Sequence, residues 1–176
     1  RIKLSAGLLS SDQARGLAAL ASEFGKGSIH LTTRGNLEIH GIPESAVPAL
    51  RERLAALGLS GRGTAGPAVR GVACTGLGVG RDTAFLADLA GRLQRRFTGD
   101  PRYEKLPKKF KISLETDARD GRHLVQDMGL VWHPAPSGEP AWDVWIAGGL
   151  GRDPQPGFLL EAGVPDDGIL GLVEAV

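Results

Sequence analysis

The chain has 176 residues, of which 41% are hydrophobic and 23% charged, as in an ordinary globular protein. A formal net charge of +1 gives no general attraction for nucleic acid. No apolar stretch reaches the ~18 residues of a membrane span. We therefore expect neither a nucleic-acid nor a membrane partner. The chain opens on Arg1 rather than Met, so we expect a fragment of a longer protein.

The N-terminal third predicts a small two-layer unit with the order strand, helix, strand, strand, helix. Apolar residues at helical spacing (Ala14, Leu17, Ala18, Ala21 and Phe24) predict a first helix that Ser10 or Ser11 caps. Gly35-Asn36 is a turn signal between two alternating segments, and Arg34 continues the face of His30. The predicted strands and helices span residues 2–4, 11–24, 28–33, 37–40 and 45–57.

The remainder of the chain predicts a second α/β unit. Ser60 to Pro67 is the most linker-like stretch, so we expect domains at residues 1–62 and 63–176. The loop Gly76–Gly80 follows a strand but lacks the spacing of a dinucleotide or P-loop motif. We expect further strands and helices at residues 68–74, 83–97, 110–114, 128–132, 142–146 and 166–176.

Cys74 is the only cysteine, which excludes a disulfide within the chain and fits a reducing cytoplasm as its location. One thiol cannot supply a four-thiolate iron–sulfur cluster or a structural zinc site. The four histidines lack ligand spacing, so no metal site is predicted from these residues. We interpret Cys74 as a small, partly buried apolar residue.

Four cationic residues in three segments predict a site for a small oxyanion. Lys109 and Lys111 lie two apart on a predicted strand, so they project to the same face. Two like charges side by side repel unless an anion or water lies between them. Arg34 and Arg70 also lie on, or at the end of, predicted strands, which hold geometry better than loop tips.

The same segments carry a resemblance to a known family. Their order resembles that of the sirohaem-dependent sulfite and nitrite reductases, in the N-terminal half of the enzyme. The Leu-Thr-Thr-Arg and Leu-Pro-Lys-Lys-Phe-Lys segments are the more specific ones. The segments concerned are Leu31–Arg34 with Asn36, Arg70–Val72, Leu106–Ile112, Asp127–Val131 and Gly148–Arg152.

The resemblance implies an α+β fold, with a ferredoxin-like half-domain followed by a mixed-sheet α/β domain that binds sirohaem. It implies six-electron reduction of sulfite or nitrite. Arg34, Arg70, Lys109 and Lys111 would bind the substrate and sirohaem, and the two lysines would also be catalytic by helping to deliver protons. The weaker cofactor-binding candidates are Asn36, Gly149, Gly151 and Arg152.

The resemblance also implies partners outside this chain. The family's 4Fe-4S cluster is held by four cysteines of a second repeat, which are absent here, so this chain alone should neither bind the cluster nor turn over. A C-terminal half that carries the cluster and an electron-donor protein or domain are therefore expected. Where such cysteines would follow the lysine strand, this chain has Glu115 to Asp120.

Two other interpretations stay open at this point. Precorrin-3B synthase, an oxygenase of cobalamin biosynthesis, resembles the same scaffold but generally lacks the Lys-x-Lys pair. A separately folded, non-catalytic half that docks a partner subunit is the third hypothesis. Sulfite and nitrite cannot be separated on the sequence, because both are small oxyanions reduced by six electrons.

Overall fold

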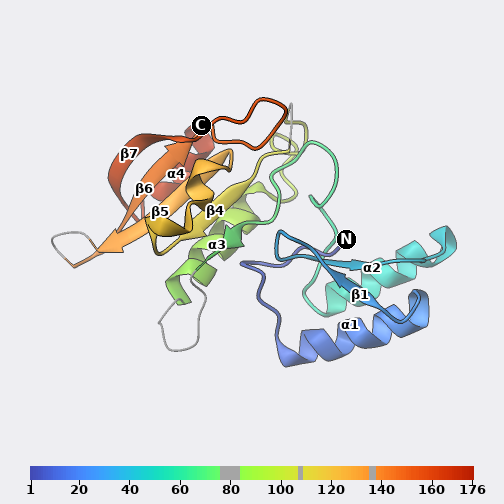
Figure 1. Ribbon diagram of the computed structural model, residues 1–176. Helices are drawn as coiled ribbons and strands as arrows, with labels where there is room; N and C mark the ends of the chain where they lie inside the picture. Colours follow the sequence, from blue (N-terminus) through green and yellow to red (C-terminus); the bar gives the residue numbers. More distant parts are fainter. Residues whose placement is uncertain (76–83, 107–108, 135–137) are drawn as a thin grey trace.

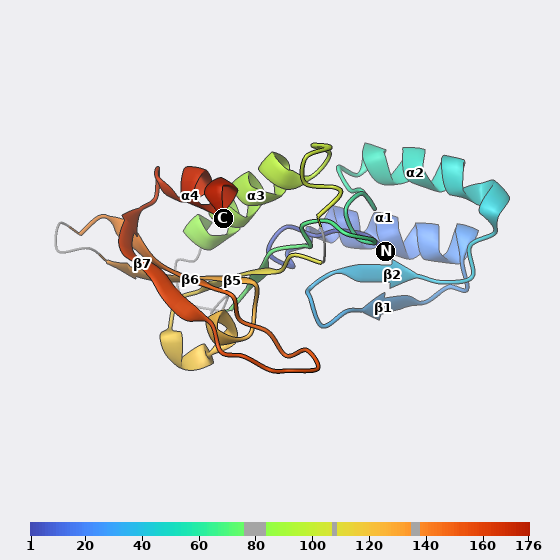
Figure 2. The ribbon, with the colours of Figure 1, turned by 90° about the horizontal axis from the view of Figure 1, so that it is seen from above.

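The computed structural model describes residues 1–75, 84–106, 109–134 and 138–176. Within them it has a two-stranded and a five-stranded sheet, and the α-helices lie on one side of the two sheets (Figures 1 and 2). None of the described helices is long and apolar enough to cross a membrane. The elements are α1 (Ser11–Phe24), β1 (Ile29–Leu31), β2 (Leu37–Ile39), η1 (Glu44–Ala46), α2 (Val47–Ala56), β3 (Ala73–Cys74), α3 (Ala84–Phe97), β4 (Ile112–Glu115), η2 (Ala118–Asp120), η3 (Arg122–Leu124), β5 (Met128–Pro134), β6 (Pro140–Ile146), β7 (Phe158–Pro165) and α4 (Ile169–Ala175).

Helix α1 begins and ends as the sequence predicts. Ser10 accepts a hydrogen bond from the Gln13 backbone and Gln13 reaches back to the Ser10 backbone, which forms a capping box. The predicted apolar stripe is partly wrong, because Ala14 and Ala18 are exposed and Leu20 is buried in their place. The core of this N-terminal unit is one cluster, made up of Ile2, Leu4, Leu17, Leu20, Ala21, Leu37, Ile39, Leu50, Leu54 and Leu59.

The predicted strand over residues 28–33 is shorter in the structure, because the chain turns at Thr32. Thr32 Oγ1 accepts the backbone N–H of Asn36 at 3.0 Å, and Gly35 has the left-handed φ of 65° that closes the turn. Leu31, the last residue of β1, is 75% exposed. Arg34 therefore lies in a tight turn rather than on a strand.

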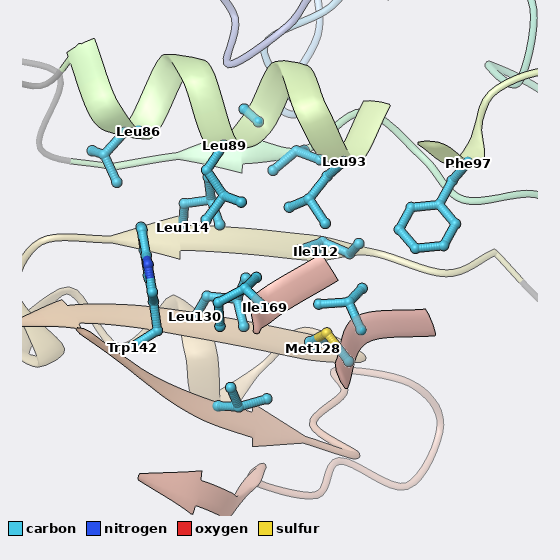
Figure 3. Packing of buried hydrophobic residues seen from close by; sticks show 14 of the residues in the cluster. Leu86, Leu89, Leu93, Phe97, Ile112, Leu114, Met128, Leu130, Trp142 and Ile169 are labelled. Atoms are coloured by element: carbon cyan, nitrogen blue, oxygen red, sulfur yellow. The ribbon is translucent and has the colours of Figure 1, made fainter. Parts of the chain in front are cut away.

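The second sheet has the strand order β3-β4-β5-β6-β7, with β3, β4 and β5 parallel and the last two pairs antiparallel. It is the predicted mixed sheet. The sequence reading missed β7, an edge strand. Helices α3 and α4 cover one face and form the main core with the strands (Figure 3). Its largest fully buried side chains include those of Leu86, Leu89, Leu93, Ile112, Leu114, Met128, Leu130, Trp142 and Ile169.

The connection between β4 and β5 carries the short helices η2 and η3 on the sheet face opposite to α3 and α4 (Figure 2). The parallel β4–β5 register pairs Ile112 with Met128. The residues that precede the two strands therefore start from the same edge of the sheet. The expected domain boundary at residues 62 and 63 stays a prediction. The loop Gly76–Gly80 and the predicted start of the helix at residue 83 lie outside the described residues.

Candidate functional site

A cavity of about 900 Å³ lies between the turn after β1 and the five-stranded sheet. Cationic side chains from three segments line it, together with two acidic ones and a glycine-rich loop after β6. Its volume is within the range of small-molecule and cofactor sites. The charged lining residues are Arg34, Lys109, Lys111, Arg122, Asp127 and Asp153.

A second cavity of about 400 Å³ adjoins the first. Thr33, Arg34, Gly71 and Lys109 line both, so the two hollows share a wall. Arg70 lines the smaller cavity only. The structure thus brings all four predicted cations, which lie up to 77 positions apart in the chain, to one pair of adjoining cavities.

Arg70 is a buried guanidinium that has no carboxylate partner among the residues that the structure describes. Arg70 is only 3% exposed, and within the described ranges its guanidinium donates to the carbonyl of Gly66, 2.7 Å from Nη2. Nε and Nη1 are buried and have no partner among the described residues. Burial, and then the charges of Arg34 and Arg1, lower the pKa of Arg70. Buried unpaired donors are costly, so this site is suited to an anionic ligand.

The backbone that carries Arg70 is fixed from two sides. Its N–H donates to the carbonyl of Phe110 at 2.8 Å, which links it to the lysine segment. The neighbouring Gly71 packs on the Asn36 side chain, and a Cβ at this glycine would lie 3.0 Å from both Asn36 polar atoms. Asn36 Oδ1 in turn accepts the Leu4 N–H at 2.9 Å. Asn36 lines the smaller cavity and also joins two chain segments.

Lys109 and Lys111 both line the larger cavity, as their spacing predicts, although they precede β4 and do not lie on the predicted strand. They differ in their partners. Lys111 Nζ is 2.9 Å from Asp127 Oδ2, and the same oxygen accepts the Lys111 backbone N–H at 2.8 Å. Lys109 has no ion pair among the described residues and is exposed at the cavity. One lysine is therefore held by a carboxylate, and the other is available to a ligand.

The weaker cofactor-binding candidates differ in whether they line a cavity. Gly149 and Gly151 line the larger cavity, and no atom lies within 4 Å of a Cβ placed on either, so their backbone faces open space. Gly148 is packed instead, because a Cβ there would lie 2.5 Å from the Leu124 carbonyl oxygen. Arg152 is exposed and is not among the residues that line either cavity.

The sequence reading missed Arg122 and Asp127 as individual cavity residues. Asp127 stood within a segment used for the resemblance, but its pairing with Lys111 was not anticipated. The parallel register of β4 and β5 explains this ion pair. It pairs Ile112 with Met128 and so places the preceding residues, Lys111 and Asp127, side by side. Arg122 lies in an irregular connection without periodicity, so no pattern pointed to it.

Cys74 is unsuited to hold a metal cluster. It is a free, partly buried cysteine, and burial raises the pKa of its thiol to about 12. No group of three or more histidine, cysteine, aspartate or glutamate side chains within the described ranges could hold a metal ion. The residues of this chain therefore do not fit a 4Fe-4S cluster.

The chain matches two profiles of protein families. Residues 1–57 match the nitrite/sulfite reductase ferredoxin-like half domain, and residues 71–176 match the nitrite and sulphite reductase 4Fe-4S domain. The second match alone covers more than half of the chain. The chain belongs to the nitrite and sulphite reductase family. This confirms the predicted family and α+β fold.

Curated relatives agree with this assignment. A protein named Sulfite reductase [ferredoxin] 1 from Mycolicibacterium paratuberculosis is 28% identical over 100% of this chain and 32% of its own length. A Ferredoxin--nitrite reductase from Synechococcus elongatus is 33% identical over 95% of this chain and 34% of its own length. The chain thus spans about a third of the length of these relatives.

Solved structures give the same fold. The chain matches the structure of Mycobacterium tuberculosis NirA protein with a TM-score of 0.83 and 25% identity, covering 96% of this chain and 31% of NirA. It also matches dissimilatory sulfite reductase I with a TM-score of 0.79 at 11% identity, a likeness of fold alone. Relatives with both sulfite and nitrite reductase names share the family, so membership does not decide the substrate.

Proposed function

We propose that this chain forms the anion-binding part of a sirohaem- and iron–sulfur-dependent reductase that reduces sulfite or nitrite with six electrons. The convergence of Arg34, Arg70, Lys109 and Lys111 on two adjoining cavities carries the proposal. The names of the relatives support the reductase over the oxygenase and over a non-catalytic docking half.

The cavity residues fit a flat, polycarboxylate ligand such as sirohaem. Exposed backbone at Gly149 and Gly151 lets a flat group approach closely, and Arg34 and Lys109 supply positive charge for carboxylates. Sirohaem, when bound, would supply the metal to which the oxyanion binds and through which electrons arrive. The 4Fe-4S cluster would come from the remainder of the protein, because this chain lacks its ligands.

The cationic residues would then act on the substrate in distinct ways. Arg70 is pre-organised and buried, so it would bind an anionic oxygen without paying the cost of ordering a flexible side chain. Arg34 and Lys109 would neutralise charge that builds up as electrons are added. Lys111, held by Asp127, would keep an ammonium proton in place for transfer to an oxygen that leaves as water.

The proposal extends to partners. A reduced electron donor is required, and the names of the curated relatives identify ferredoxin as the donor for those enzymes. We infer a donor of the same class here. The substrate is a small oxyanion, sulfite or nitrite, that the four cations would bind as a unit.

The test is steady-state reduction of sulfite and of nitrite by the complete protein with a chemical reductant. Lys109→Ala and Arg34→Ala should each lower kcat/KM by about 100-fold, the usual effect of removing one electrostatic stabiliser of a transition state. Lys105→Ala is the matched control, since Lys105 is exposed and lines neither cavity. Variants as active as the control would refute the proposal.

A further inference from the structure

We propose that Arg122 is a further anion-binding residue of the larger cavity, and that the buried pair Glu115 and His123 holds it there. This inference rests on the proposed function, because it concerns a ligand of the same cavity. The ligand group is an anionic oxygen, which a free oxyanion or a carboxylate of a macrocycle can supply.

Arg122 meets the requirements of a binding residue. It lines the larger cavity together with Arg34, Lys109 and Lys111, and it is exposed there. Its guanidinium has no carboxylate partner within the part of the chain that the structure describes. Arg119, three positions earlier, is instead held by Asp117, with its Nε 2.9 Å from Oδ2.

The backbone of Arg122 is fixed by a carboxylate with no exposed surface. Its N–H donates to Glu115 Oε2 at 3.1 Å, and the same oxygen lies 3.1 Å from His123 Nδ1. The other carboxylate oxygen accepts the Ser113 hydroxyl at 3.0 Å. A fully buried carboxylate is tolerated only when donors surround it, so these bonds tie strand β4 firmly to η3.

Close packing behind η3 leaves its orientation little freedom. A Cβ on Gly129 of strand β5 would lie 2.3 Å from the Cα and Cβ atoms of His123, far inside van der Waals contact. The His123 ring also packs against the Trp145 ring, with centroids 4.8 Å apart. Gly121 enters the turn with a left-handed φ of 70°. His123 is thereby held inward, and Arg122 beside it stays at the cavity.

The position of Glu115 supports a functional rather than a purely stabilising reason for this pair. In the same strand, Leu114 is a buried apolar residue and Ser113 a buried polar one, and an apolar residue at position 115 would avoid the cost of burying a charge. The charge instead positions the turn whose continuation, Val125 to Asp127, also lines the cavity and holds Lys111.

The test measures binding, not turnover. Inorganic phosphate and uroporphyrin, a metal-free polycarboxylate macrocycle, are titrated onto the complete protein prepared without cofactors, by calorimetry and by fluorescence. Arg122→Ala should weaken binding of at least one probe by about fivefold. Arg119→Ala removes the same charge from the adjacent turn without touching the cavity and should leave both affinities unchanged.

The two probes separate the sources of the anionic oxygen. Weaker phosphate binding alone assigns Arg122 to the free oxyanion, and weaker uroporphyrin binding alone assigns it to a macrocycle carboxylate. Wild-type affinity of Arg122→Ala for both probes, or equal losses in Arg119→Ala, would overturn this inference and leave the proposed function standing. A wild-type protein that binds neither probe would overturn the proposed function itself.

The positioning role of Glu115 has its own readout. Glu115→Gln should weaken binding of the affected probe about as much as Arg122→Ala does. The variant that combines both changes should bind that probe no more weakly than either single variant. Glu174→Gln, which breaks the Arg96–Glu174 ion pair away from both cavities, is the control for a general loss of stability. Additive losses, or wild-type affinity of Glu115→Gln, would rule out this role.

Discussion

The Lys111 ammonium lies 2.9 Å from Oδ2 of Asp127, and the same oxygen accepts the backbone N–H of Lys111 at 2.8 Å. One carboxylate thus fixes both the side chain and the main chain of a residue at the cavity. Both side chains are partly exposed, at 25% and 32%, so the ion pair contributes modestly to stability. Its value lies in holding the ammonium in one place.

Asp127→Asn tests this arrangement, because it removes the negative charge and keeps an oxygen for the backbone N–H. Loss of a carboxylate from the cavity makes its potential more positive, so phosphate should bind about threefold more tightly. Turnover of the complete enzyme should fall, because Lys111 loses its fixed position. Binding is measured by calorimetry, and weaker phosphate binding by the variant would show that Asp127 does not lower the affinity of the cavity for anions.

Arg70→Met tests whether the buried guanidinium is retained for a ligand. Without an anion, the unpaired charge contributes little or costs stability, so the free energy of unfolding should change by no more than about 1 kcal/mol. Phosphate should raise the melting temperature of the wild type but not that of the variant. A variant much less stable in anion-free buffer would assign Arg70 a structural role.

The buried ammonium of Lys3 should make the stability of the protein depend on pH in the alkaline range. Its ammonium is 4% exposed and donates to the Val69 carbonyl and the Thr98 hydroxyl at 3.1 and 2.9 Å. Burial, and then the charge of Arg70, lower its pKa to about 8 from an ordinary value of 10.5, and Glu104 partly opposes this. The unfolded chain binds more protons than the folded one between these values, so stability should rise with pH across that window.

The measurement is chemical unfolding of wild type and Lys3→Met between pH 7 and pH 10. The stability of the wild type relative to the variant should increase as pH rises above about 8, by up to ~3 kcal/mol for the full window. Subtracting the free energy of unfolding of the variant from that of the wild type removes the contribution of the other lysines and of tyrosine titration. A difference that does not change with pH, or that falls, would show that Lys3 is not held in this way.

Gly129→Ala should be strongly destabilising, because its Cβ would lie only 2.3 Å from the Cα of His123. β5 and η3 must then move apart, which should lower the free energy of unfolding by roughly 3 kcal/mol. Gly171→Ala in α4 is the control, since a Cβ there meets no atom within 4 Å. It should stabilise the protein by about 0.5–1 kcal/mol as a helix substitution. Thermal and chemical unfolding compare the two, and equal effects would contradict the close packing.

Regular elements were predictable wherever apolar periodicity was strong. Leu86, Leu89, Leu93 and Phe97 all lie in the core, as their spacing predicts. Strand β7 escaped prediction because it is an edge strand whose residues up to Gly163 are exposed, so it lacks a buried alternating face. Its pairing with β6 is also irregular between Trp142 and Trp145, and such a bulge leaves no simple sequence signal.

The candidate site was predictable only in part, because it depends on contacts between segments that are distant in the sequence. The spacing of Lys109 and Lys111 predicts their common direction, but their partners depend on which segments the sheet brings together. Asp127 reaches Lys111 through the parallel pairing of β4 and β5, which local sequence does not encode, and Arg122 lies in the connection between these strands. Leu31 is a second example, because it lies at the end of a strand in a sheet of only two strands and stays 75% exposed.

The most direct test locates an anion bound to the complete protein. Selenate is a tetrahedral oxyanion whose selenium can be found by anomalous diffraction. We expect an anomalous peak within hydrogen-bond distance of Arg34, Arg70 and Lys109 in crystals of the protein soaked with selenate. A peak bound elsewhere with these three side chains unengaged would contradict the claim that they form one oxyanion site.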